Sequence, residues 1–148
     1  MYTHILLPTD GSKLADKAVK QGILLAKSLG ARVTILTATP EFQVVMDEGF
    51  VLPNAVMLRK RFEDETARRA KKLLDAARAG AQAAAVSCET AMTSSGRPYE
   101  AIIKQAKKSK CDLIMMASHG RKGLSSILLG SETTKVLTHS TIPVLVVR

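Results

Sequence analysis

Aromatic residues are scarce in this chain, which has no Trp, two Tyr and three Phe among its 148 residues. Proteins that bind single-stranded nucleic acid stack the bases on aromatic side chains, so the scarcity weighs against that class of function. Hydrophobic residues nevertheless make up 46% of the chain, which is enough to bury one continuous core at this length. We therefore expect a single domain over residues 1–148, with a core of Ala, Val, Ile, Leu and Met.

Cysteines and long apolar runs are few as well. Cys88 and Cys111 lie far apart, without a Cys-x-x-Cys motif or a neighbouring His, so the sequence predicts reduced thiols and neither a zinc site nor a redox pair. The N-terminal segment lacks the basic residues and the apolar run of a signal peptide. No apolar stretch is long enough to span a bilayer. These features predict a soluble cytoplasmic protein without a membrane partner.

Acidic residues are outnumbered by basic ones, 13 to 22, and the formal net charge is +9. Such a charge attracts the phosphates of nucleic acids. Many of the basic residues, however, fall in two candidate helices, at 54–79 and after Pro98, where their helical spacing favours solvated outer faces. We therefore expect weak, salt-sensitive binding to duplex DNA and no specific nucleic-acid partner.

Short apolar runs alternate with helical patterns along the whole chain. We predict strands at 5–7, 33–38, 86–92, 112–117 and 142–147. We predict helices from Ser12 to a stop at Gly30, at 54–79, from Pro98 and at 131–140, with a loop at 40–53. Uniformly apolar strands that are separated by helices favour a parallel sheet with both faces covered. The fold class is therefore α/β, a three-layer sandwich with a five-stranded, doubly wound sheet.

Two loops that follow strands carry the candidate site, because ligands bind such sheets at the carboxyl ends of the strands, where the strand order reverses. The first loop is Pro8-Thr9-Asp10-Gly11-Ser12. The second, 117–131, holds three glycines and ends at a helix N-terminus, which predicts a phosphate-binding loop with free N–H groups at Gly130-Ser131. It matches neither the Walker A nor the Gly-x-Gly-x-x-Gly pattern. Glycines that serve only turns and caps remain the alternative.

These two loops, the Gly96-Arg97-Pro98 turn and the closing segment 142–147 together resemble the universal stress protein family over the whole chain. The resemblance implies the adenine nucleotide alpha hydrolase-like, flavodoxin-like form of the doubly wound fold. It also implies a stress-response or signalling module that binds ATP, or else AMP or cyclic AMP, with Mg²⁺ held through the phosphates.

Members of this family that bind ATP carry Gly-x2-Gly-x9-Gly-Ser/Thr. Gly120, Gly130 and Ser131 match this motif, but Ala117 stands at the first glycine. Because alanine is the smallest change, we expect ATP binding, unless this position requires a positive φ. A universal stress protein that acts through protein partners without ATP, and a slow ATP hydrolase, remain the alternatives.

The resemblance also implies individual roles. Asp10 would contact the base or the ribose, Ala38 the adenine, and Ser131 with Thr133 would donate to phosphate. Asp10 could equally cap the first helix. His119 has no clear carboxylate partner, so we expect no catalytic residue and no protein-bound metal. The full set of nucleotide-binding residues is Pro8, Thr9, Asp10, Ala38, Met116, Ala117, Gly120, Gly130, Ser131, Glu132 and Thr133.

The closing segment predicts a homodimer. Pro143 has no N–H and is tolerated mainly on an edge strand, whereas the residues from Val144 to Val147 are too apolar for an open edge. A two-fold partner would cover residues 142–147, and the usual dimer of the family, built on the last strand, agrees with this expectation.

Overall fold

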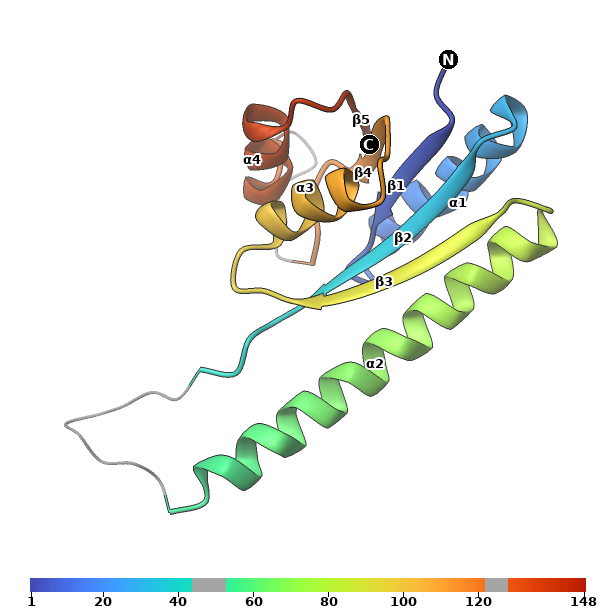
Figure 1. Ribbon diagram of the computed structural model, residues 1–148. Helices are drawn as coiled ribbons and strands as arrows, with labels where there is room; N and C mark the ends of the chain where they lie inside the picture. Colours follow the sequence, from blue (N-terminus) through green and yellow to red (C-terminus); the bar gives the residue numbers. More distant parts are fainter. Residues whose placement is uncertain (44–52, 122–127) are drawn as a thin grey trace.

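The computed structural model describes residues 1–43, 53–121 and 128–148. Strands and helices alternate along the chain (Figure 1). Their bounds are β1 His4–Pro8, α1 Lys13–Leu29, β2 Arg32–Thr39, α2 Ala55–Ala83, β3 Cys88–Ser94, α3 Pro98–Lys108, β4 Leu113–Ala117, α4 Ser131–His139 and β5 Val144–Val147. Most of the predicted loop at 40–53 lies outside the described residues. No helix in the described part of the chain is long and apolar enough to cross a membrane.

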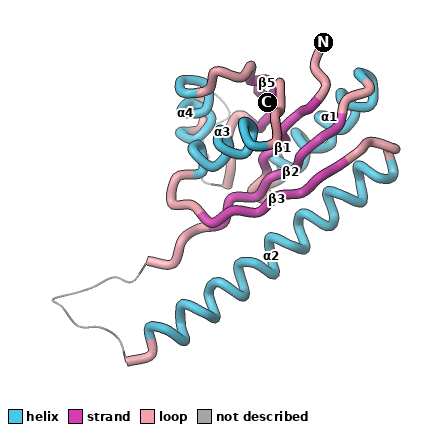
Figure 2. The backbone as a smooth tube through the Cα atoms, viewed as in Figure 1, coloured by secondary structure: helices cyan, strands magenta, loops and turns pink. Residues whose placement is uncertain are grey.

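The five strands form one parallel sheet in the order β3-β2-β1-β4-β5. Helices α1 and α2 lie on one face, and α3 and α4 on the other (Figures 1 and 2). The predicted three-layer, doubly wound architecture is confirmed. The order 3-2-1-4-5 is that of dinucleotide-binding sheets and differs in detail from the flavodoxin order 2-1-3-4-5. The order reverses between β1 and β4, which places the candidate crevice there.

Each face of the sheet has its own hydrophobic core. Successive side chains of a strand point to opposite faces, so Ile5 and Leu7 pack toward α1 and α2 while Leu6 packs toward α3 and α4. All three are fully buried. β1 is therefore covered by apolar packing on both faces, as predicted for a strand in the middle of the sheet.

The edge strand β3 differs from the prediction. It covers Cys88–Ser94 instead of residues 86–92, and exposed residues recur along it. The shift arises because α2 runs one turn past residue 79, to Ala83, and residues 84–86 end that helix.

Helices α1, α2 and α3 end in the same way. After α1, α2 and α3, one residue adopts the left-handed conformation, namely Gly30 (φ 65°), Ala85 (φ 58°) and Lys110 (φ 54°). In each case the next N–H bonds back to the carbonyl five positions earlier, as Val86 does to Ala81 at 2.9 Å. This is the Schellman motif, in which glycine is the favoured left-handed residue. Of these three helix ends, only that of α1 carries the glycine that indicates the motif in a sequence.

We expect Ala85→Gly to raise the free energy of unfolding by about 1 kcal/mol, because a left-handed conformation is strained for a residue with a Cβ. Ala85 is exposed, so its methyl group has no packing to lose. The control is Ala84→Gly. Ala84 has a φ of −83°, which alanine adopts without strain, so glycine there should lower the free energy of unfolding because it loses more conformational freedom on folding. Urea denaturation measures the free energy of unfolding of both variants. Equal changes at positions 84 and 85 would show that the left-handed conformation of Ala85 is not strained.

Candidate functional site

The two predicted loops meet at the carboxyl edge of the sheet. β1 and β4 are neighbours, with Leu6 paired to Ile114, although β2 and β3 separate them in sequence. Pro8 ends β1 and Ala117 ends β4, so the segments that follow leave the sheet side by side. Ala38, near the end of β2, lies at the same edge. The structure therefore places these predicted residues where doubly wound sheets bind ligands.

The carboxylate of Asp10 joins the two loops. Its Oδ1 accepts a hydrogen bond from the backbone N–H of Ser12 at 2.9 Å. Its Oδ2 accepts one from the backbone N–H of Arg121, also at 2.9 Å, in the loop after β4. The N-cap of α1 is Ser12, whose hydroxyl accepts from the N–H of Ala15. Asp10 thus acts as a clamp between the loops, and the alternative that it caps the first helix is wrong.

This clamp keeps the Asp10 carboxyl ionised. Burial alone would raise its pKa, but hydrogen bonds from Ser12 and from the Arg121 N–H, with the charge of Arg121, outweigh burial and lower the pKa below its ordinary value. Ionised Asp10 therefore stabilises the fold at neutral pH, and this contribution is lost as the pH falls through the folded-state pKa. Its negative charge suits the hydroxyl or amino donors of a ligand and repels phosphate.

Gly120 allows the clamp to close. A Cβ at this position would lie 2.4 Å from Oδ2 of Asp10, well inside van der Waals contact. The resemblance explains this glycine by the room that a ligand needs. The structure adds a second reason, since the Asp10 carboxylate itself fills that space.

Ala117 occupies its position without strain. Within the described residues, the residues other than glycine with a positive φ are Ala85 and Lys110, so Ala117 does not need the freedom of glycine. Its side chain is 7% exposed and packs in the core beneath α1 and α2, beside Val147. The methyl group is therefore directed into the protein interior.

The N-terminus of α4 faces the same crevice, but Gly130 does not offer its amide as expected. The N–H of Gly130 donates to the carbonyl of Ser118 at 2.7 Å. A Cβ on Gly130 would lie 3.0 Å from Cα of His119 and 3.3 Å from that carbonyl. Gly130 is thus required for the close contact between the loop and the start of the helix. The first-turn N–H groups, from Ser131 onward, have no acceptor within the helix, and the positive end of the helix dipole lies there.

Two residues predicted to bind nucleotide are engaged within the protein. The hydroxyl of Thr133 is buried and donates to the carbonyl of Ala117 at 3.0 Å. It therefore fixes α4 to the end of β4, which corrects its expected role as a phosphate donor. The carboxylate of Glu132 accepts from the N–H of Tyr99 at 2.8 Å and pairs with Lys135 at 2.9 Å. Glu132 thus joins α4 to the start of α3.

The remaining predicted residues differ in how much surface they offer. Thr9 is buried and bonded to β2, through its N–H to the carbonyl of Leu36 and through its carbonyl to the hydroxyl of Thr37. Met116 is 6% exposed and belongs to the core under α3 and α4, so it has little surface for a ligand. The ring of His119 has the hydroxyl of Ser118 as its partner, at 3.2 Å.

Sequence reasoning missed Arg121. Its backbone N–H holds Asp10, and its Nη2 lies 3.0 Å from where a Cβ on Gly11 would be. A backbone donor leaves no signature in the sequence, and the one available signal was its position directly after Gly120. Within residues 1–43, 53–121 and 128–148, no group of three His, Cys, Asp or Glu side chains is placed to hold a metal ion.

We expect Gly120→Ala to lower the free energy of unfolding by roughly 1–3 kcal/mol, because the added methyl group separates Asp10 from its donors. In an Asp10→Ala background the same substitution should cost little, since the clamp is already absent. A double-mutant cycle by urea denaturation measures this coupling. An equal cost in both backgrounds would show that Gly120 serves something other than the clamp.

The comparisons with known proteins agree over the full length of the chain. The model of the universal stress protein family matches residues 1–148. Universal stress protein YxiE of Bacillus subtilis is 34% identical over 152 residues, which cover 100% of each chain. UspA from Lactobacillus plantarum has a TM-score of 0.83 at 26% identity and covers 99% of this chain and 98% of its own. A universal stress protein in complex with cAMP has a TM-score of 0.71 at 25% identity, with 99% and 97% covered. The protein described here therefore belongs to the universal stress protein family.

Proposed function

We propose that this universal stress protein binds an adenine nucleotide, with ATP as its main ligand, in the crevice between the ends of β1 and β4. The observation that carries the proposal is the position of Ala117. Its φ is not positive, and its methyl group packs in the core. The departure from the glycine motif therefore leaves the ligand side of the loop open.

The charges of the crevice favour one orientation of the nucleotide. The ionised Asp10 would accept from the ribose or the adenine, near Ala38, and the positive N-terminus of α4 would bind the phosphates at Ser131. Mg²⁺ would be held through the phosphates. A relative with 25% identity is a complex with cAMP, which shares the adenine, the ribose and a phosphate with ATP.

We further propose a binding and signalling role without dedicated catalysis. The loop histidine, His119, is paired with the hydroxyl of Ser118, and no carboxylate among the described residues is bonded to it as an orienting partner of a general base. Binding, exchange of ATP for another adenine nucleotide, and the resulting change at the crevice would then constitute the signal.

We expect calorimetric titration with ATP and magnesium to give a dissociation constant in the micromolar range. A helix N-terminus contributes about 1 kcal/mol and each backbone N–H bond to a charged oxygen roughly 1.5–3 kcal/mol, which together reach micromolar affinity. AMP and cyclic AMP, titrated in the same way, rank the nucleotides.

Three variants locate the site. Gly130→Val should abolish binding, because its side chain would displace the start of α4 from His119. His119→Ala should bind as the native chain does, and Ala117→Gly should bind equally or better. Circular dichroism checks that each variant is folded. Binding by Ala117→Gly but not by the native chain would overturn the proposal, and so would native affinity in folded Gly130→Val.

The exposed edge of β5 supports a proposed homodimer. β5 is an edge strand, and Leu145 on it is 43% exposed. An apolar edge of this kind is prone to pair with another strand. A second copy that pairs through residues 142–147 would cover it by two-fold symmetry.

Sedimentation at micromolar concentration should therefore give a dimer, and Leu145→Glu should convert it to monomer. The matched control is Met92→Glu. Met92 is 48% exposed on β3, at the opposite edge of the sheet, and the control should remain dimeric. A monomeric native chain would contradict the proposal.

A further inference from the structure

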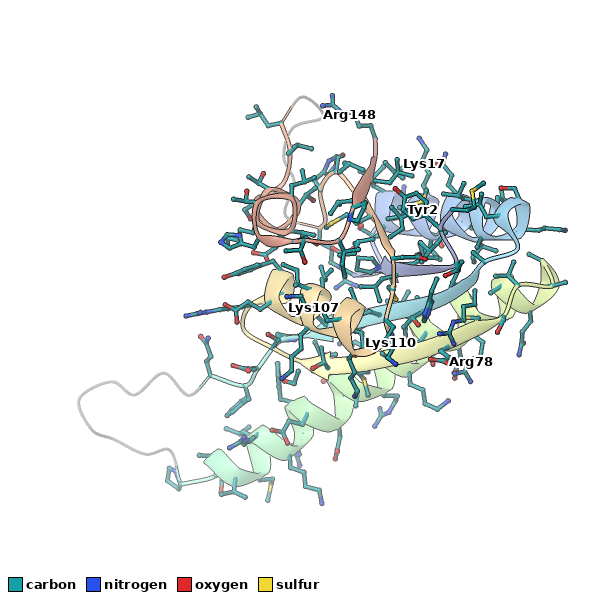
Figure 3. All side chains as sticks on the ribbon, turned by 45° about the horizontal axis from the view of Figure 1, so that its top comes forward. Tyr2, Lys17, Arg78, Lys107, Lys110 and Arg148 are labelled. Carbon is teal, nitrogen blue, oxygen red and sulfur yellow. The ribbon has the colours of Figure 1, made fainter. Side chains whose placement is uncertain are left out.

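Both basic helices carry exposed positive charge. On α2, three basic residues are paired with acidic ones four positions away, namely Arg59 with Glu63, Arg69 with Glu65, and Lys71 with Asp75, and the other basic residues of this helix take part in no ion pair among the described residues. On and just after α3, four lysines are exposed and take part in none of the ion pairs found among the described residues. They are Lys104, Lys107, Lys108 and Lys110. Figure 3 shows Lys107 on α3 and Lys110 just past its C-terminal end. These four lysines thus form a cluster of unpaired positive charge on and just after α3.

A surface hollow lies beside these lysines. Its volume is about 430 Å³, and it is lined by Tyr99, Glu100, Ile103, Lys104, Lys107 and His139. Five of these residues come from α3 and one from the end of α4, on the face of the sheet where the two helices pack together. The half-buried Ile103 gives the hollow an apolar wall, and Lys104 and Lys107, one helical turn apart, give it a cationic rim.

The wall formed by Tyr99 is held in place by its neighbours. The ring of His139 is tilted against it with 5.2 Å between the centroids, and Nζ of Lys135 lies 5.4 Å from its centroid. The Tyr99 hydroxyl donates to Glu100 at 2.9 Å, and its N–H donates to Glu132. The ring is therefore held in one orientation by a cationic and an aromatic neighbour.

The acidic groups beside the hollow are already neutralised. Glu100 pairs with Arg97 at 3.0 Å. Its hydrogen bonds from Arg97 and Tyr99 hold the pKa of this carboxyl below its ordinary value. Glu132 pairs with Lys135. A ligand carboxylate at Lys104 and Lys107 would therefore meet positive charge that no acidic group of the described residues balances.

We propose that this hollow between α3 and α4 binds an acidic peptide segment of a partner protein. An apolar side chain of the segment packs against Ile103 and the Tyr99 ring, and flanking carboxylates pair with Lys104 and Lys107. Charge complementarity and an apolar anchor in one place are what a short acidic motif with one large hydrophobic residue requires. The site is separate from the crevice at β1 and β4, so it gives the protein a second binding surface.

Fluorescence anisotropy tests the proposal with a short labelled peptide of Glu and Asp that carries one central Phe. Binding should weaken about tenfold in Lys104→Glu/Lys107→Glu, since two charge-assisted contacts are lost. The matched control, Lys71→Glu/Lys72→Glu on α2, makes the same change in net charge and should bind as the native chain does. Ile103→Asn should weaken binding without any change of charge, as should replacement of the Phe by Ala.

Three results would overturn the proposal. Equal weakening by the two lysine pairs would show attraction to net charge alone. Equal binding of the peptides with Phe and with Ala would show that no apolar anchor exists. Tighter binding of a single-stranded oligonucleotide, lost in Lys104→Glu/Lys107→Glu, would assign the surface to nucleic acid. Circular dichroism and an ATP titration of each variant show that the fold and the crevice are intact.

Discussion

The carboxylate of Asp10 joins two loops whose bonded residues, Asp10 and Arg121, are 111 positions apart in the sequence. Several features of the crevice follow from this contact. It requires glycine at position 120, since a Cβ there would collide with Oδ2. It keeps the carboxylate charged at neutral pH, because its hydrogen bonds outweigh burial. It also sets the start of the loop whose other end, at Gly130, is bonded to Ser118.

The crevice is therefore polar at both ends, with opposite signs. Asp10 supplies a fixed negative charge, and the N-terminus of α4 supplies positive partial charge. A ligand with hydroxyl or amino donors at one end and phosphate at the other matches this arrangement, which is why we propose an adenine nucleotide and not a plain anion. The position of Ala117 adds to the match, since its methyl group packs in the core.

Local signals in the sequence predicted much of the fold. Ser12, Gly30 and Pro98 mark helix ends through the conformations they favour, and all three hold those places in the structure. Alternation of apolar runs with helices predicted the parallel sheet, and the sheet then brought the two loops together. The start of β3 could not be predicted, because α2 ends at Ala83 and the left-handed residue that follows is Ala85 instead of the usual glycine.

The partners of individual polar groups were harder to predict, for a physical reason. Whether the hydroxyl of Thr133 meets a phosphate or the carbonyl of Ala117 depends on where α4 lies relative to β4, and no local pattern encodes that distance. The same holds for the N–H groups of Gly130 and Arg121, which are backbone donors common to all residue types except proline. The ion pairs of α2 are a matter of spacing, because Arg59, Arg69 and Lys71 each lie four positions from an acidic residue.

Helix α4 connects the two surfaces, since its N-terminus lies at the crevice while Lys135 and His139 flank Tyr99 beside the hollow. An NMR titration of the ¹⁵N-labelled protein with ATP and magnesium tests most directly whether the nucleotide binds in the crevice. We expect the amide signals of Gly120, Arg121, Ser131 and Glu132 to shift together and saturate, while those of Lys104 and Lys107 remain in place. Shifts confined to α3, or none at Ser131, would contradict binding in the crevice.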